Sequence, residues 1–462
     1  MTPENLMSLG PLALMALTGI ATMVLSPFWP ARRLHALAGA GFLATLALIL
    51  LRYGAPEAPA TALLADDGVA RFGAALVVIS GLAALVFLAR DRNAREAPAL
   101  VALGTAGALA TVAATHAVTL FLGLEITTLA VVVLLAFPLG AVALEAGYKY
   151  FLMAGATAAA LLLGLAFGFA ATGELGIGIW AGQDSMLALG LALVLTALVF
   201  KFSLVPLHMW APDVFSGAPA SAAAFVGVVS KVAVTVVLVR LAAAGLEGPV
   251  WTTGLAIAGA ASAILGNLVA LGQTSLRRML GYSTIAHSGY MALVLSTGAD
   301  LSSEAVLFYM AGYAPALLAA LCVAARLGPD ATLSDLRGLI WRDPVPGLAL
   351  SLALLSMAGL PPAVGFIGKI YIFSALAEAA AWPHLAAALL GAALAVFYYI
   401  QFAVQIFIRD ADPVPKGHEV PIAQTIMLVA ASGTIVAVGL YPEYLVMLVR
   451  SAVPVSALVS GG

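Results

Sequence analysis

The sequence predicts an all-α polytopic membrane protein with about fourteen transmembrane helices in a single membrane domain. Of its 462 residues, 63% are hydrophobic and only 9% are charged, whereas a soluble domain has about 25% charged residues. Apolar runs of about 20 residues, enough to cross a hydrocarbon core of about 30 Å, follow one another almost end to end. The runs are continuously apolar rather than alternating, which excludes a β-barrel, and the connections are too short for a soluble domain.

The fourteen runs divide into an N-terminal group, two groups of five and a final run. The N-terminal group (1–96) holds runs 6–26, 33–52 and 70–90. The first group of five (97–244) holds 97–115, 118–138, 145–173, 186–206 and 220–244; the second (250–408) holds 250–272, 276–297, 303–327, 345–381 and 384–408; the final run is 421–449. Glu4 and no basic residue precede the first run, so we expect a retained helix rather than a cleaved signal peptide.

The basic residues in the loops predict the orientation of the chain in the membrane. Alternate loops hold twelve Lys and Arg on one side: Arg32, Arg33, Arg90, Arg92, Arg95, Arg277, Arg278, Arg326, Arg337, Arg342, Arg409 and Lys416. The other side holds four: Arg52, Arg71, Arg240 and Arg450. We expect the first side to be cytoplasmic, so that both termini lie on the opposite side.

Five charged residues fall inside the apolar runs: Glu125, Lys149, Lys201, Lys231 and Lys369. Each charge near the bilayer centre costs roughly 2.5–3.5 kcal/mol. Exposed to lipid, the five would cost about 12–17 kcal/mol, which rivals the roughly 5–15 kcal/mol that stabilises a typical protein. They must therefore face the interior of the helix bundle, pair with one another, or touch water.

Structural roles are also open to some of these residues. Lys149 lies about one turn inside its run, where its long side chain could reach the headgroups. Glu125 could be a static partner of a lysine, and His287 a satisfied interior histidine rather than a proton carrier. Lys201 lies some fifteen residues into its run and Lys231 close to the middle of its own, so neither side chain easily reaches the headgroups, which favours a functional role.

Prolines interrupt two of the runs. Pro206, followed by Pro212, lies beside Lys201, and Pro361 and Pro362 lie in the same run as Lys369. A proline has no N–H, so the carbonyl four residues earlier loses its helical partner, and lipid cannot replace that bond. Each broken run is the fourth of its group of five (helices 4–8 and 9–13), and the two groups begin on opposite sides of the membrane. Matching breaks in two inverted repeats indicate a transporter site.

Buried lysines and a carboxylate are suited to moving protons. Burial in a medium of low dielectric constant disfavours a charged lysine, and a nearby carboxylate favours it. A change in the distance between Glu125 and a lysine would therefore switch that lysine between holding and releasing a proton. A chain of such groups, linked by hydroxyls, histidine and water, is a proton relay.

Six segments carry a resemblance to a known family: "LGLEITTLA", "YKYFLMAGA", "KFSLVPLHMWAPDVFSGAP", "VVSKVAV", "LRRMLGYSTIAHSGYM" and "GLPPAVGFIGKIYIF". They resemble the antiporter-like membrane subunits of respiratory NADH:quinone oxidoreductase (complex I), over nearly all of residues 97–408. Within this family the resemblance is strongest to the N type: "GFIGK" has lysine where the M type has glutamate, and the chain stops soon after its last run, without the lateral helix of the L type.

The resemblance implies fourteen helices with two inverted five-helix units, and a proton channel through Glu125, Lys149, Lys201, Lys231 and Lys369. It implies a non-redox subunit of the bacterial inner membrane whose partners are other complex I subunits, with no nucleic acid. The chain has one cysteine, Cys322, so it cannot ligate an iron–sulfur cluster through cysteines. No cofactor or metal is expected in this chain; flavin, clusters and quinone are expected in partner subunits. Two alternatives remain: an Mrp-type cation/proton antiporter or membrane-bound hydrogenase subunit, and a structural scaffold with static ion pairs.

Overall fold

The computed structural model describes residues 3–88, 95–137, 139–181, 184–246, 248–409 and 421–453. Helices dominate it, and ten helices within this part of the chain are long and apolar enough to cross a membrane. The prediction of a polytopic helical membrane protein is therefore confirmed. The chain divides into two compact units: unit 1 is Met1–Phe202, Ala224–Leu255 and Val449–Gly462, and unit 2 is Ser203–Ala223 and Ala256–Leu448.

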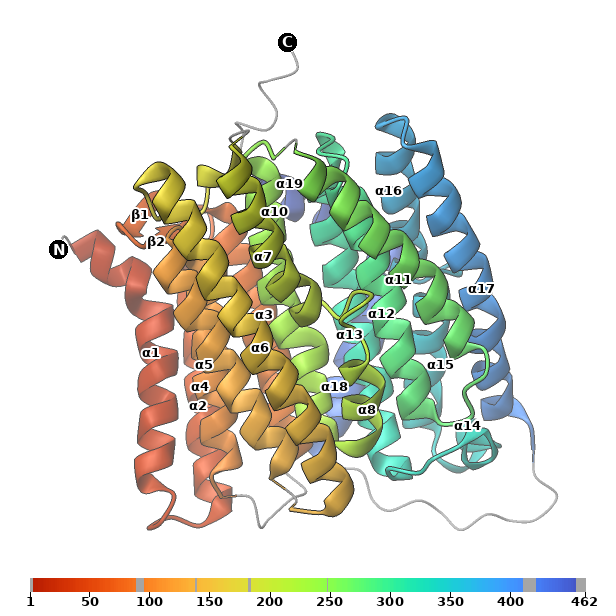
Figure 1. Cartoon of the computed structure of the whole chain (residues 1–462). Helices are drawn as coiled ribbons and strands as arrows, with labels where there is room; N and C mark the ends of the chain where they lie inside the picture. The colour runs from red at the N-terminus through yellow and green to blue at the C-terminus, as the bar shows by residue number, and fades with distance from the viewer. Residues whose placement is uncertain are drawn as a thin grey trace. The chain divides into compact units, whose positions relative to one another are not determined.

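Unit 1 is packed around α4 (Ala97–Ala113), which contacts α1 (Pro3–Leu25), α3 (Gly68–Leu88) and α5 (Ala117–Ala136) (Figure 1). Small residues allow α4 and α5 to pack closely, because a Cβ atom at Gly107 would lie 2.8 Å from the backbone nitrogen of Thr127. The unit also contains α2 (Ala31–Leu51), α6 (Ala141–Thr172), η1 (Ile179–Ala181), α7 (Ser185–Lys201), η2 (Phe225–Val229), α10 (Ser230–Ala243) and η3 (Val250–Gly254).

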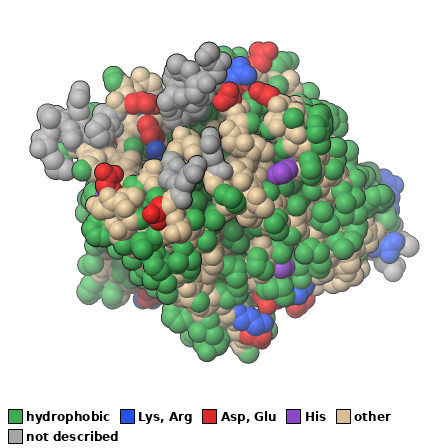
Figure 2. All heavy atoms as spheres, turned by 45° about the horizontal axis from the view of Figure 1, so that its top comes forward, with side chains coloured by type: hydrophobic (Ala, Val, Ile, Leu, Met, Phe, Trp, Pro, Cys, Tyr) green, Lys and Arg blue, Asp and Glu red, His purple; other side chains and the backbone are tan. Residues whose placement is uncertain are grey.

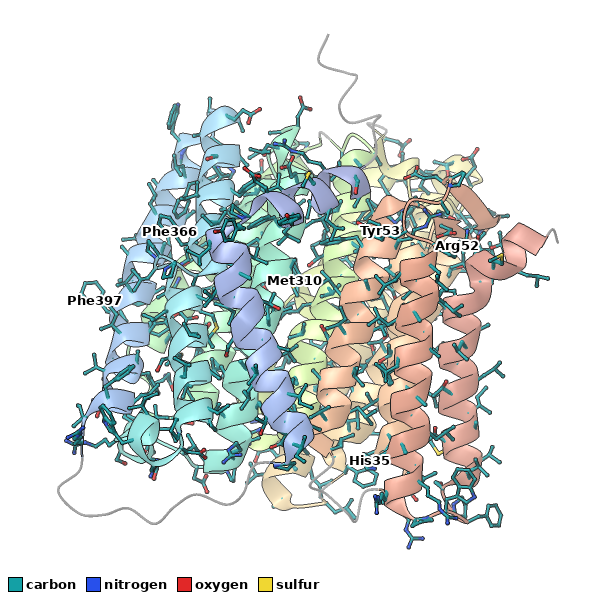
Figure 3. All side chains as sticks on the ribbon, turned by 180° about the vertical axis from the view of Figure 1, so that it is seen from behind. His35, Arg52, Tyr53, Met310, Phe366 and Phe397 are labelled. Atoms are coloured by element: carbon teal, nitrogen blue, oxygen red, sulfur yellow. The ribbon has the colours of Figure 1, made fainter. Side chains whose placement is uncertain are left out.

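A short β-hairpin between α2 and α3 is absent from the all-α prediction. Its strands, β1 (Ala58–Thr61) and β2 (Leu64–Asp66), pair antiparallel. The segment is short and lies between apolar runs, so its composition gave no signal. Asp66 at the end of β2 accepts hydrogen bonds from Arg52 Nε at 2.8 Å and from Arg71 Nε at 2.7 Å. Arg52 and Tyr53 mark this end of α2 in Figure 3.

Replacing Asp66 with asparagine is expected to reduce the stability of this hairpin end by about 2 kcal/mol, because hydrogen bonds to charged groups are lost. Burial alone would raise the pKa of Asp66, but hydrogen bonds from Arg71, Arg52 and Ser8 and the charge of Arg71 outweigh it and hold the pKa below its ordinary value. A group with a lowered pKa stabilises the fold fully above its unfolded pKa, about 3.9 for aspartate. Its contribution is lost as the pH falls through the lower, folded pKa.

Thermal denaturation of the purified complex at neutral and acidic pH measures this effect. The control is Asp300→Asn, since Asp300 is exposed and its side chain makes no capping hydrogen bond. The expectation fails if both variants lower the melting temperature equally at neutral pH, or if the Asp66→Asn deficit persists unchanged in acid.

Unit 2 is packed around α13 (Leu301–Leu327), which contacts α12 (Leu276–Leu295), α15 (Pro344–Ala358), α16 (Val364–Glu378) and α18 (Ile422–Leu440). Nearly all of the α13 side chains are buried, as expected of an apolar helix at the centre of a bundle. The remaining elements here are α8 (Trp210–Gly217), α9 (Ala220–Ala224), α11 (Leu255–Ala270), η4 (Leu333–Leu336), α14 (Leu339–Arg342), α17 (Trp382–Phe407) and α19 (Glu443–Ala452).

Large apolar side chains cover much of the surface. Hydrophobic side chains dominate the face drawn in Figure 2. Phe397 on α17 projects outward in Figure 3 and is 68% exposed. A soluble monomer rarely exposes contiguous apolar patches of this kind, whereas lipid solvates them without cost.

The two interrupted runs break beside the predicted lysines. Run 186–206 is helical only to Lys201, where α7 ends, and run 345–381 is divided between α15 and α16. Pro212 differs from the prediction, because it lies in the first turn of α8. The N–H groups of a first turn have no helical acceptor, so a proline there costs no hydrogen bond. Pro212 therefore begins a helix instead of breaking one.

Candidate functional site

Lys201 is the last residue of α7, and its side chain is buried. The ammonium group donates a hydrogen bond to Thr128 Oγ1 on α5. Glu125 lies three residues before Thr128 and interacts electrostatically with Lys201. The Oε1 atom of Glu125 is buried and has no hydrogen-bond partner in the described part of the chain. The structure thus brings Lys201 and Glu125 together, but a threonine hydroxyl receives the ammonium hydrogen bond.

Thr128 is a contact that the sequence analysis missed. The signal was present in "LEITT", because residues three apart on a helix lie on the same face. The spacing therefore predicts that the side chains of Glu125 and Thr128 are neighbours on α5. The Thr128 hydroxyl accepts the hydrogen bond from the Lys201 ammonium and donates its own proton to the carbonyl of Leu124.

The first helix break follows Lys201 directly. Ser203 has a φ of 60°, in the left-handed region, and the Val205–Pro206 peptide bond is cis. Because Pro206 has no N–H, the carbonyl of Phe202 lacks its helical donor. The ammonium of Lys231, fully buried on α10, donates to this carbonyl at 2.7 Å. The Lys231 side chain therefore replaces the hydrogen bond that the proline removes.

The second break, between α15 and α16, repeats this arrangement in unit 2. Gly359 has a φ of 80°, and the Pro361–Pro362 bond is cis. Pro362 leaves the carbonyl of Ala358 without its helical donor, and Lys369 Nζ donates to that carbonyl at 2.7 Å. On the far side of the break, the N–H of Gly365 donates to Ser356 Oγ at 3.1 Å.

The two breaks share one local plan. In each, a carbonyl capped by a lysine precedes a residue with left-handed φ, then a leucine, then a cis peptide bond to proline. The sequences are "FSLVP" at 202–206 and "AGLPP" at 358–362. Buried backbone polar groups need partners, and lysine side chains supply them at both breaks.

His287 and Lys149 lie in different surroundings. His287 is buried on α12, and both of its ring nitrogens lie within hydrogen-bonding distance of tyrosine hydroxyls. The side chain of Lys149 on α6 is 48% exposed and forms an ion pair of 2.8 Å with Glu145, one turn earlier. Lys149 is thus the least buried of the four lysines in the apolar runs, in keeping with its position near the end of its run.

The described His, Cys, Asp and Glu side chains bear on whether the fold offers a metal site. Within the described ranges, no group of three or more His, Cys, Asp or Glu side chains could hold a metal ion. Cys322 is buried on α13. The groups described at the two breaks are lysine amines, hydroxyls, backbone carbonyls and the carboxylate of Glu125.

A helical membrane bundle with lysines buried at two matching helix breaks is the architecture of an ion-translocating membrane protein. Residues 114–395 match the family model described as NADH:quinone oxidoreductase/Mrp antiporter, transmembrane. The chain belongs to this family and, within it, to subunit N of NADH-quinone oxidoreductase.

Two relatives support the assignment to subunit N. NADH-quinone oxidoreductase subunit N from Rhodopseudomonas palustris (strain BisA53) is 49% identical over 459 residues, covering 98% of this chain and 100% of that protein. The protein of the same name from Cereibacter sphaeroides (strain ATCC 17025 / ATH 2.4.3) is 46% identical, covering 96% of this chain and 98% of its own length.

Solved structures agree with the fold. A chain of respiratory complex I from Thermus thermophilus with bound aureothin is 34% identical and superposes with a TM-score of 0.86, over 95% of this chain and 98% of that one. A chain of the Mrp complex from Dietzia sp. DQ12-45-1b superposes with a TM-score of 0.89 at 20% identity, over 99% of this chain and 98% of that one. The second likeness concerns the fold alone.

Proposed function

We propose that this chain is a proton-translocating, non-redox membrane subunit of a bacterial NADH:quinone oxidoreductase. Lys201, modulated by Glu125, is the central switch; Lys231 and His287 relay protons, and Lys369 exchanges them with the far side of the membrane. The observation that carries the proposal is the shared plan of the two helix breaks, where a lysine ammonium caps the carbonyl that a proline leaves unpaired.

Lysine suits each helix break because its side chain can lose its charge and still donate a hydrogen bond to the backbone carbonyl. A protonated ammonium has three N–H donors. The neutral amine that remains after proton release keeps two, so it still donates to the carbonyl of Phe202 or Ala358. Lys231 and Lys369 can therefore release a proton while each break keeps its hydrogen bond.

Glu125 is placed to control the charge of Lys201. A negative carboxylate favours the protonated lysine, whereas surroundings of low dielectric constant disfavour it. Glu125 lies on α5 and Lys201 ends α7, so a small shift of either helix changes the separation of the two side chains and thus the balance. Lys149, whose side chain is partly exposed, lies nearer the expected cytoplasmic side and acts at the proton input or between neighbouring charge pairs.

The proposal extends to architecture and assembly. Fourteen membrane-crossing segments would include two inverted units of five (helices 4–8 and 9–13), with both termini on the periplasmic side of the inner membrane. The repeated plan of "FSLVP" and "AGLPP" supports such units. The partners are the other complex I subunits, especially adjacent antiporter-like and small membrane subunits. Flavin, iron–sulfur clusters and quinone belong to those partners, which supply the redox energy.

Replacing Lys369 with alanine in the assembled complex tests the proposal. Proton pumping in sealed vesicles, driven by NADH oxidation, is expected to fall by about tenfold or more, because acid–base groups of this kind contribute 10²–10⁴-fold. Arg33→Ala, which removes an exposed positive charge on α2, is the control and is expected to pump normally. Full pumping by an assembled Lys369→Ala complex would show that protons do not pass through this residue.

A further inference from the structure

His287 lies at the centre of a hydroxyl cluster in unit 2. Its Nδ1 atom is 2.6 Å from Tyr309 Oη on α13, and its Nε2 atom is 3.0 Å from Tyr399 Oη on α17. Tyr399 Oη in turn shares a hydrogen bond with Ser283 Oγ, one turn before His287 on α12. Four side chains from three helices thus form one unbroken line: Tyr309, His287, Tyr399 and Ser283.

The partners of this imidazole leave its tautomer undetermined. A structural histidine is usually fixed in one tautomer, because a carbonyl or carboxylate that can only accept binds one ring nitrogen. Here both partners are hydroxyls, which donate and accept equally well. Either ring nitrogen of His287 can therefore carry the proton, and the reverse pattern of hydrogen bonds fits the same atoms.

The Tyr309 end of the line faces the second helix break. A Cβ atom at Gly368 would lie 3.0 Å from Cδ2 of Tyr309, so the tyrosine ring packs directly against α16 beside Lys369. The ammonium of Lys369 also lies 5.8 Å from the ring centroid of Tyr290, which is buried between α12 and its neighbours. The hydrogen bond described for Lys369 goes to the carbonyl of Ala358 and not to Tyr309, so the chain proposed below requires a bridging water molecule for that step.

Other side chains hold the line in place. The Tyr398 ring packs against the Tyr399 ring at a tilt of 44°, with 4.3 Å between the centroids. Asn267 on α11 accepts from Tyr398 Oη at 2.9 Å and donates to Tyr290 Oη at 2.7 Å. Asn267 therefore positions the tyrosines on both sides of the cluster, while an amide is a poor proton carrier and stays outside the line itself.

We propose that Tyr309, His287, Tyr399 and Ser283 form a proton-conducting chain that leads from Lys369 to Ser283, in the direction of the Leu276 end of α12. At each link one O–H or N–H bond forms as the next one breaks, so that a proton entering at one end releases a different proton at the other. The imidazole takes up a proton on one nitrogen and gives up the proton of the other. The hydroxyls then rotate to restore the starting pattern. The inference rests on the proposed function and adds the route on one side of Lys369.

Tyr309→Phe and Tyr399→Phe test the chain, because each removes a single hydroxyl and keeps the ring. Proton pumping by the assembled complex is expected to fall by about tenfold or more in each variant. Tyr313→Phe is the matched control. Tyr313 is equally buried on α13 and its ring lies 4.6 Å from that of His287, but its hydroxyl donates to Thr284 and not to the imidazole. Tyr313→Phe is expected to pump normally.

The chain is refuted if Tyr309→Phe and Tyr399→Phe assemble and pump at the normal rate, or if Tyr313→Phe loses as much activity as they do. Lys369→Ala, measured in parallel, separates this failure from that of the proposed function. Loss of pumping in Lys369→Ala with normal pumping in the two tyrosine variants leaves the lysine function standing and removes the chain. Normal pumping in Lys369→Ala removes the proposed function itself.

Discussion

Replacing Lys201 with arginine is expected to lower the rate of proton translocation by the assembled complex by about tenfold or more. Arginine keeps the positive charge but does not release its proton at any physiological pH. If Lys201 acts by changing its protonation state, a permanent charge cannot replace it. The guanidinium also brings five N–H donors into a buried site where Thr128 receives the only hydrogen bond described for the Lys201 ammonium.

Proton pumping and quinone reduction by the Lys201→Arg complex, reconstituted in vesicles, measure this effect. Lys416→Arg is the control, because Lys416 is the one lysine outside the apolar runs. Complex assembly is checked in both variants by the yield of intact particles. Undiminished pumping in Lys201→Arg would mean that a static charge suffices at this position, as the scaffold alternative requires.

Replacing Gly359 with alanine is expected to disable the second break and displace Lys369. Gly359 has a φ of 80°, which costs an L-residue roughly 1–2 kcal/mol. A Cβ atom here would also lie 2.5 Å from Lys369 Cδ and 3.2 Å from its Nζ. The lysine side chain must therefore move, and its hydrogen bond to the carbonyl of Ala358 is lost. We expect both lower stability and a loss of pumping comparable with that of Lys369→Ala.

The Gly298→Ala variant distinguishes the effect of backbone strain from the effect of displacing the Lys369 side chain. Gly298 has a φ of 64°, but a Cβ atom there would meet nothing within 4 Å. Its alanine variant is expected to lose stability through strain alone and to pump normally. Equal pumping in the two variants would contradict the assignment of Gly359 as the residue that makes room for Lys369.

The breaks and their lysines were predictable because the physics involved is local. An apolar run needs only length and composition to be recognised, and a proline loses its N–H whatever surrounds it. The positions of Pro206 and Pro362 therefore predicted that the carbonyls of Phe202 and Ala358 lack their helical N–H donors. The same reasoning failed for Pro212, since a proline in a first turn looks identical in sequence to one that ends a helix.

The hairpin at Ala58–Thr61 and Leu64–Asp66 was unpredictable for a related reason. Strands this short have no measurable period, and the arginines that stabilise Asp66 come from α2 and α3. Counting Arg52 and Arg71 as loop charges served only the prediction of orientation, which stays a prediction. It did not indicate that they form a buried ion-pair cluster.

By itself, the sequence determined that this protein spans a membrane many times, that five charged residues lie inside its apolar runs, and that two of its helices break beside lysines. Only the tertiary structure decided which lysine meets which carbonyl. Lys231 caps Phe202 from 29 residues away, and Tyr309 and Tyr399 reach His287 from two other helices. The physical reason is the short range of the hydrogen bond: a pattern along the chain fixes which groups need partners, but only packing brings distant side chains within about 3 Å.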